Sequence, residues 1–184
     1  AIMALFEGSA DRAVAAGVAL LQALAEYNLT RQRRDRQPIE IGIGINTGNL
    51  ILGTVGGNSR IDTTVIGDAV NLSSRLEQLT KTYKTPLLIS HNTFACLEEP
   101  IKYALRLVAR VQVRGKAERV GVFEVFDADP PAQKQAKLET KAMFETALIH
   151  YYQGSMKEAQ ILFDRCLHNN PSDRVAQIYR QRCA

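Results

Sequence analysis

The sequence contains no tryptophan, only three cysteines and no strong excess of either charge. Its 23 basic and 19 acidic residues leave a net charge of +4 over 184 residues. That charge suits an anionic ligand such as a nucleotide, but it is too small to indicate nucleic-acid binding. Cys96, Cys166 and Cys183 have neither metal-ligand spacing nor a disulfide pattern. We therefore expect reduced thiols and a cytoplasmic protein.

Long apolar runs are also missing. The apolar runs that exist are short and interrupted, which excludes a membrane span and a signal peptide within this sequence. Hydrophobic residues still make up 46% of the chain, enough for a real core. The opening AIMALFEG starts inside an apolar run without an initiator methionine. This start predicts that the sequence is a fragment of a longer protein.

The residue pattern predicts strands interleaved with helices, followed by a purely helical tail. We expect strands over 1–6, 39–45, 50–55, 86–91, 104–113 and 120–126. We expect helices from Ser9 or Asp11, from Asp68, and within HNTFACLEE, where Asn92 or Thr93 is the expected N-cap. RQRRDRQP (31–38) and GNSRID (57–62) predict solvated loops, and DADPPAQKQ (127–135) predicts a linker. This order of elements indicates an α/β or α+β domain that carries an all-α extension.

The helix from Asp68 to about Lys81 has a clear core face. Leu72, Leu76 and Leu79 recur at helical spacing, so they should point into the core. Gly67 supplies a tight turn before the helix, and Asp68 is the expected cap of its first N–H groups.

Asn71 and Arg75 lie four residues apart on a neighbouring face of the same helix. An amide and a guanidinium side by side near a helix start, where the helix dipole is positive, make a plausible nucleotide or phosphate site. Such a pair is more often simply solvated, so the spacing alone leaves both readings open.

The ordered blocks GIGINTG and TVIGDAVNLSSRLE make the nucleotide reading specific. Together they closely resemble the catalytic domain of class III adenylyl and guanylyl cyclases of the bacterial type, with the likeness running from Ala1 to about Phe126. The spacing GxGxxxG differs from a dinucleotide-binding loop and leads into a hairpin, so we expect its glycines to serve close strand packing.

The resemblance implies an α+β fold, a ferredoxin-like βαββαβ core that here lacks its N-terminal part, over residues 1–128. It implies a head-to-tail homodimer with nucleotide sites in the interface, where the ribose 3′ oxygen of ATP attacks the α-phosphorus and pyrophosphate leaves. Asn71 aligns with the asparagine that orients the ribose. Arg75 aligns with the arginine that stabilises charge on the phosphoryl oxygens, a role that suits a permanently charged planar group.

Three further residues are expected to bind substrate by the same resemblance. Thr64 occupies a purine-reading position, where a hydroxyl can accept a hydrogen bond from the adenine amino group, so ATP is favoured over GTP. Arg114, with Lys116 adjacent, aligns with the basic residue that a hairpin brings to the triphosphate. The alternative for both is an ordinary turn charge.

The family's two metal-binding aspartates would precede Ala1, so no metal ligand is expected in this sequence. Two Mg²⁺ or Mn²⁺ ions normally polarise the phosphates, and metal catalysis supplies several kcal/mol. In this family each site takes its metals from one subunit and the Asn–Arg pair from the other. We therefore expect the chain alone to be inactive, although its parent is an adenylate cyclase.

Residues 129–184 form the expected all-α extension. Gly154, Ala159, Phe163 and Pro171 fall at the positions of a tetratricopeptide-type repeat, to which the tail is similar. Ser155 and Glu158 predict a capping box, and a third helix is expected from about Ser172. One repeat is too short for an independent solenoid, so we expect the tail to pack on the cyclase domain or its dimer mate.

Three other functions stay open from the sequence. The chain could be a non-catalytic pseudo-cyclase half that works through dimerisation and its helical tail, or part of a guanylate cyclase. It could also be a generic nucleotide-binding sensor, which would bind nucleotide without turnover. Asn71 and Arg75 favour an enzyme, because a pure scaffold has no need of that pair.

Overall fold

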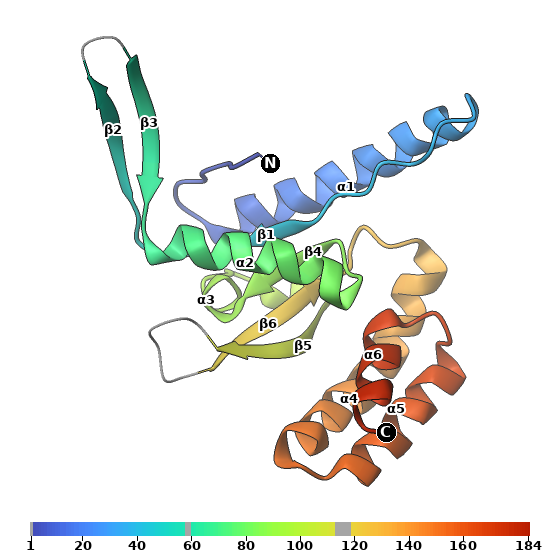
Figure 1. Ribbon diagram of the computed structural model, residues 1–184. Coiled ribbons are helices and arrows are strands. Elements are labelled where there is room, and N and C mark those ends of the chain that lie inside the picture. Colours follow the sequence, from blue (N-terminus) through green and yellow to red (C-terminus); the bar gives the residue numbers. More distant parts are fainter. Residues whose placement is uncertain (1, 58–59, 113–118) are drawn as a thin grey trace.

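A computed structural model describes residues 2–57, 60–112 and 119–184. Its centre is a sheet of four described strands in the order β1-β4-β6-β5 (Figure 1). These strands are β1 (Ile43–Ile45), β4 (Leu87–Ser90), β5 (Leu105–Gln112) and β6 (Arg119–Val125). β1 runs parallel to β4, and β6 is antiparallel to both β4 and β5. The mixed α+β class expected from the sequence is therefore confirmed.

Helices cover both faces of this sheet. α1 (Ala10–Gln32), α3 (His91–Ala95) and the short 3₁₀ helix η1 (Pro100–Lys102) follow the chain around one side. Val14 of α1 joins Leu87 and Ile89 of β4 in one core cluster. α2 (Asp68–Tyr83) and the C-terminal helices share the second cluster with Leu88. Alternate residues of β4 thus face opposite cores, as the period of two in a strand requires.

The structure confirms the predicted start of α1 and corrects the predicted N-cap of α3. Ser9 caps α1 as expected, with its hydroxyl accepting from Asp11 N at 3.2 Å. The N-cap of α3 is Ser90, whose Oγ accepts from Thr93 N at 3.1 Å, so the assignment to Asn92 or Thr93 was wrong. Strand β4 and helix α3 meet without a gap, which left Ser90 hidden inside an apparent strand.

The N-terminal run does not form the expected buried strand. Residues 2–7 are irregular, and the side chains of Ile2 and Met3 are 98% and 58% exposed. Within the described residues no strand lies beside this run to pair with its backbone. Apolar composition alone could not supply that partner, because a strand is stable only with hydrogen-bonded neighbours.

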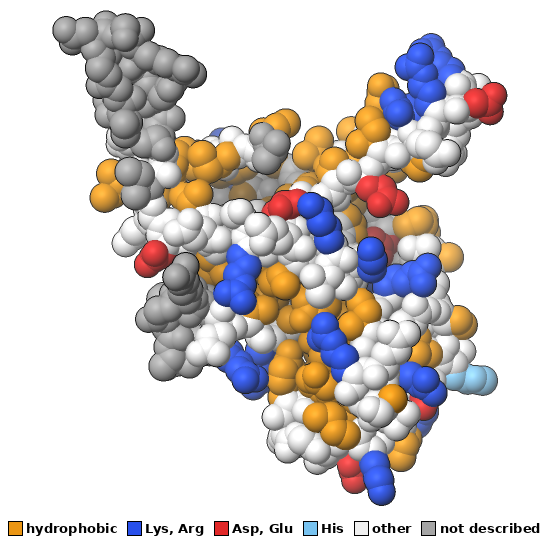
Figure 2. Space-filling model, in the orientation of Figure 1, with side chains coloured by type: hydrophobic (Ala, Val, Ile, Leu, Met, Phe, Trp, Pro, Cys, Tyr) orange, Lys and Arg blue, Asp and Glu red, His pale blue; other side chains and the backbone are white. Residues whose placement is uncertain are grey.

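The basic run at the end of α1 is solvated, although its first residues are helical. α1 continues to Gln32, and the chain then turns, with Arg31 Nε donating to Gln37 O at 2.8 Å. Arg33, Arg34 and Arg36 are exposed. Figure 2 shows this basic group at the end of α1, away from the body of the protein.

Strand β1 is shorter than expected, and helix α2 lies directly on it. A Cβ on Gly44 would sit 2.4 Å from the backbone atoms Glu77 N and Ser73 O. Ser73 Oγ donates to Gly44 O at 2.7 Å and fixes this close approach. The glycines of GIGINTG do serve close packing, but their neighbour is a helix rather than a strand.

Replacing Gly44 by alanine should therefore destabilise the fold. The added methyl group would overlap backbone atoms that cannot move aside, and we expect a loss of about 3 kcal/mol in the free energy of unfolding. Urea denaturation followed by circular dichroism measures this loss. Gly53→Ala is the matched control, because a Cβ there meets nothing within 4 Å. Equal midpoints for the two variants would contradict the close approach.

An antiparallel hairpin projects from the body of the protein (Figure 1). It consists of β2 (Ile51–Gly57) and β3 (Arg60–Ile66), paired from Ile51 with Ile66 to Gly57 with Arg60. The first strand confirms the expected apolar run. The polar loop expected over 57–62 is wrong, since β3 already begins at Arg60. The abundance of β-branched residues in RIDTTVI was the missed signal.

The tail forms three helices, α4 (Pro131–Gln153), α5 (Met156–Asn169) and α6 (Arg174–Arg182). The expected linker is shorter, because Pro131 is accepted in the first turn of α4. Gly154 ends α4 in the left-handed region at φ 85°. Ser155 precedes α5 but makes no side-chain capping bond, so the expected capping box is absent. α6 is capped by Asp173, one residue after the expected start.

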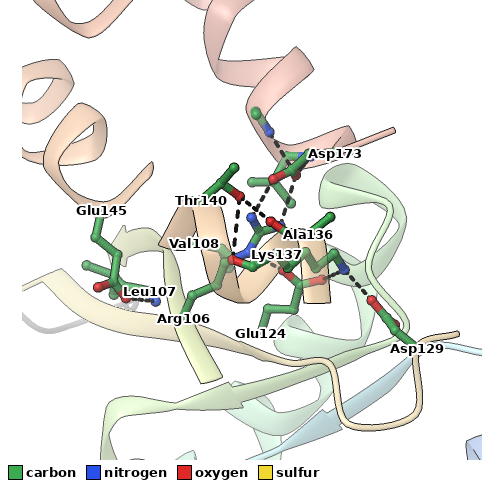
Figure 3. A network of polar contacts seen from close by, with 12 residues as sticks. Arg106, Leu107, Val108, Glu124, Asp129, Ala136, Lys137, Thr140, Glu145 and Asp173 are labelled. Carbon is green, nitrogen blue, oxygen red and sulfur yellow. Dashed lines mark hydrogen bonds and ion pairs between the residues drawn. The ribbon is translucent and has the colours of Figure 1, made fainter. Parts of the chain in front are cut away.

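A buried group of ion pairs joins the tail to the sheet (Figure 3). Arg106 of β5 donates through Nε to Glu124 of β6 at 2.6 Å, and through both terminal nitrogens to Asp173 at 2.5 and 2.9 Å. Lys137 of α4 bridges Glu124 and Asp129, at 2.6 Å each. Arg106 and Asp173 are each 1% exposed. The tail therefore packs on the cyclase-like domain, as one of the two expected arrangements had it.

Candidate active site

The site is built on the first two turns of α2. The helix begins at Asp68 directly after Gly67, which is the N-cap and offers no side chain. The capping role expected for Asp68 is therefore wrong. Its exposed carboxylate instead lies in the first turn, where the positive end of the helix dipole favours a negative charge.

Leu72 and Leu76 fix the orientation of this helix. They are 7% and 0% exposed, and both belong to the core cluster beneath α2. Asn71 and Arg75 precede them by one residue each and are exposed. The structure therefore places the two predicted catalytic side chains on one accessible face, one helical turn apart.

Arg75 also contacts the end of the sheet. Its Nη1 donates to the backbone carbonyl of Gln112, the last residue of β5, at 2.5 Å. This contact orients a long side chain that would otherwise be free. Sequence reasoning could not find it, because a backbone acceptor leaves no mark on residue type.

A polar network behind the helix start was also missed. Asn46 donates through Nδ2 to Ala69 O at 3.0 Å and accepts from Ser90 Oγ at 2.7 Å. Ser90 and Thr93 are fully buried, and Thr93 Oγ1 donates to Ile45 O at 3.3 Å. The network joins the ends of β1 and β4 to the first turn of α2. The asparagine within GIGINTG was the available signal.

The three predicted substrate-binding residues are placed less fully. Thr64 lies in β3, where its backbone pairs with Gly53, and the structure does not describe its side chain. Arg114 and Lys116 fall outside the described residues. The antiparallel β5–β6 pair expected on either side of them is present, with Gln112 opposite Arg119.

The carboxylates of the described residues do not assemble a metal site. Over residues 2–57, 60–112 and 119–184, no group of three or more His, Cys, Asp or Glu side chains could hold an ion. The two divalent ions implied by the resemblance therefore do not fit this part of the chain. In the same ranges, no helix is long and apolar enough to cross a membrane.

A known protein family matches the part of the chain that contains this site. The family model described as "Adenylate and Guanylate cyclase catalytic domain" matches residues 4–125. The chain belongs to this family. The match contains β1 to β6 with α1 and α2, including Asn71 and Arg75, and ends before the helical tail.

Two adenylate cyclases show sequence similarity to this family member. "Adenylate cyclase, terminal-differentiation specific" from Dictyostelium discoideum is 35% identical over 189 residues, which is 100% of this chain and 9% of that protein. An adenylate cyclase of Anabaena cylindrica is 44% identical over 131 residues, or 68% of this chain and 26% of that protein. The chain thus spans only a small part of either relative.

Solved cyclase structures share the fold. The guanylyl cyclase Cya2 is 33% identical with a TM-score of 0.52, covering 66% of this chain and 60% of that chain. The adenylyl cyclase CyaB from P. aeruginosa is also 33% identical, with a TM-score of 0.51, covering 66% and 62%. These matches confirm the cyclase domain recognised from the two sequence blocks.

Proposed function

We propose that this chain is part of an adenylate cyclase, and that it contributes one half of a shared active site. The reaction converts ATP to 3′,5′-cyclic AMP and pyrophosphate, by attack of the ribose 3′ oxygen on the α-phosphorus. The observation that carries this proposal is the pairing of Asn71 and Arg75 on one exposed face of α2. Their exposure suits a nucleotide bound between two cyclase domains, because each side chain must reach across an interface.

The two side chains would act on different parts of the nucleotide. The Asn71 amide can donate and accept hydrogen bonds, which suits it to hold the ribose in the orientation required for attack. The Arg75 guanidinium keeps its charge at all relevant pH values and offers donors in a planar fork. It would stabilise the negative charge that develops on the phosphoryl oxygens. The contact with Gln112 O would hold the guanidinium close to its working position.

The Mg²⁺ or Mn²⁺ ions of the family would be held by the other half of the site, because the described residues of this chain form no such group. In a homodimer of two cyclase domains, each subunit would supply the Asn–Arg half to its partner.

ATP is the proposed substrate, with Thr64, Arg114 and Lys116 as proposed substrate-binding residues. The similar proteins from Dictyostelium discoideum and Anabaena cylindrica are adenylate cyclases, which supports ATP. The guanylyl cyclase Cya2, which is 33% identical, supports GTP as the alternative. We therefore expect a direct comparison of ATP and GTP turnover to decide between the two nucleotides.

A non-catalytic cyclase half is the second candidate. The observation that favours it is the bond from Arg75 to Gln112, which gives the arginine a partner within its own domain. In that case α2 would serve dimerisation, and Arg75 would only brace the sheet.

A complementation assay separates these candidates. The chain is mixed with a class III cyclase whose own Asn and Arg equivalents are replaced by alanine, and ATP or GTP is added with Mn²⁺. We expect cyclic AMP to form only in the mixture, and faster than cyclic GMP. A mixed dimer that sediments as one species but gives no cyclic nucleotide would favour the non-catalytic half.

A further inference from the structure

The free edge of strand β5 is covered by side chains of the helical tail. β5 pairs with β6 on one side, and in the described sheet no strand lies on its other side. Such an edge presents unpaired backbone N–H and C=O groups, which are costly when buried. Val108 and Ala109 are fully buried, so this edge needs partners from elsewhere in the chain.

The partners come from α4 and α6. Leu107 N donates to a Glu145 carboxylate oxygen at 3.0 Å, and Arg110 N donates to Tyr152 Oη at 2.8 Å. Tyr179 Oη donates to Val108 O at 2.8 Å and lies 3.1 Å from Tyr152 Oη. Three consecutive edge groups of β5 are thus satisfied by side chains in the way that a further strand would satisfy them.

These side chains are themselves held firmly. Tyr179 is 1% exposed. The distance between ring centroids is 5.0 to 6.5 Å from Tyr179 to each of four other aromatic residues, Tyr83, Phe144, Tyr151 and Phe163. Arg106, at the start of the same strand, is bound by Asp173 of the tail. The tail therefore fixes both the beginning and the middle of β5.

The last residue of β5 contacts Arg75 of the candidate site. Gln112 lies two residues beyond Arg110, and alternate residues of a strand direct their backbone groups to the same edge. Its carbonyl accepts the bond from Arg75 Nη1. A hydrogen-bonded path therefore runs from the tail, through Tyr152 and the end of β5, to the Arg75 guanidinium.

We propose that Tyr152 and Tyr179 are positioning residues for Arg75, and that the tail completes the active half-site by holding the edge of β5. This inference rests on the proposed function for its catalytic part. The helical extension is then a component of the catalytic apparatus rather than a separate binding module. Removing one tyrosine hydroxyl should loosen the end of β5 and let the guanidinium move, while the aromatic ring keeps the core beneath packed.

The test compares Tyr152→Phe and Tyr179→Phe with Tyr151→Phe. Tyr151 packs against the same aromatic rings, and its hydroxyl makes no hydrogen bond among the described residues. Amide exchange measured by NMR reports on the edge directly. We expect the Arg110 amide to lose about fivefold protection in Tyr152→Phe, the change that a hydrogen bond of ~1 kcal/mol corresponds to. The Leu107 amide, bound by Glu145, should change little, and Tyr151→Phe should alter neither.

Activity in the complementation assay gives the second readout. A displaced transition-state group lowers kcat with little change in KM, and we expect kcat to fall about three- to tenfold in both test variants. Unchanged protection of Arg110 would overturn the edge contact. Lost protection with full kcat would overturn the positioning of Arg75.

A failure of the proposed function is distinguishable from a failure of this inference. If the unaltered chain forms no cyclic nucleotide with its partner, the proposed function fails, and NMR relaxation of the Arg75 side-chain Nε–H replaces kcat as the readout. Greater mobility of that group in Tyr152→Phe than in Tyr151→Phe would uphold the path from tail to Arg75. Equal mobility in the two variants would overturn it.

Discussion

Arg75→Ala should reduce cyclic AMP formation in the complementation assay by about 10²- to 10³-fold, the usual cost of removing a group that stabilises transition-state charge. The helix should stay folded, because Arg75 is exposed and its neighbours Leu72 and Leu76 carry the packing. The result is read as kcat at saturating ATP, with dimer formation measured separately by sedimentation.

Arg75→Lys tests why an arginine is needed. A lysine keeps the positive charge but loses the planar fork, and we expect at least a tenfold loss. Lys81→Ala is the matched control, since Lys81 is an exposed cation farther along the same helix, paired with Glu77 at 3.8 Å. A mixed dimer in which Arg75→Ala retains full kcat would refute the catalytic role and leave Arg75 as a brace for β5.

Asp173→Ala should destabilise the whole chain by about 4 kcal/mol, because the two terminal nitrogens of the buried Arg106 guanidinium would lose their charged acceptors. Asp173 also accepts from Val175 N and Ala176 N at 3.1 and 3.2 Å, so the N-cap of α6 is lost as well. Urea unfolding, followed by far-UV circular dichroism, measures the change. Asp173→Asn keeps a capping oxygen and should therefore lose less of the free energy of unfolding.

The chain contains its own control for this prediction. Asp164 pairs with Arg180 at 3.0 Å in the same tail, but both side chains are about half exposed. Asp164→Ala should cost less than about 1 kcal/mol, as exposed ion pairs do. Similar losses in the free energy of unfolding for Asp164→Ala and Asp173→Ala would show that burial of the Arg106–Asp173 pair adds nothing to stability.

The same ion pair makes stability depend on acid pH. Burial acts to raise the pKa of Asp173, but the hydrogen bonds and charge of Arg106 outweigh it, so the pKa lies below its ordinary value. A lowered folded-state pKa stabilises the protein above the unfolded pKa, and this contribution is lost as the pH falls through the folded value. The advantage of the unaltered chain over Asp173→Asn should therefore be constant near neutral pH and shrink below about pH 4, the ordinary value for an aspartate. Urea midpoints at a series of pH values measure it.

The sequence predicted helix α2 well because its signals are local. The spacing of Leu72, Leu76 and Leu79 determines which face is buried, so the exposed placement of Asn71 and Arg75 follows directly. The family was recognisable for the same reason, since its two motif blocks are continuous in the chain. The family match over residues 4–125 confirms that recognition.

The features that were missed depend on neighbours distant in the chain. The run at 2–6 has the composition of a strand but no described strand beside it. Gly44, the glycine of β1, is explained by a helix that follows some 30 residues later. Arg106, Glu124, Lys137 and Asp173 come from four separate elements, so each alone looks like a surface charge. Their burial depends on the packing of the tail, which no local pattern specifies.

The contact between β1 and α2 has a mechanical meaning for the site. Ser73 lies between Asn71 and Arg75 in the sequence, and it is bonded to Gly44 where the helix and strand backbones approach most closely. The helix cannot slide or roll on the strand without a steric collision. Asn71 and Arg75 are therefore held on one rigid helix, and this helix is fixed to the sheet at Gly44. In the proposed dimer, any movement of the sheet relative to the second domain would displace Asn71 and Arg75 together, so the proposed half-site would approach the nucleotide or leave it as a whole.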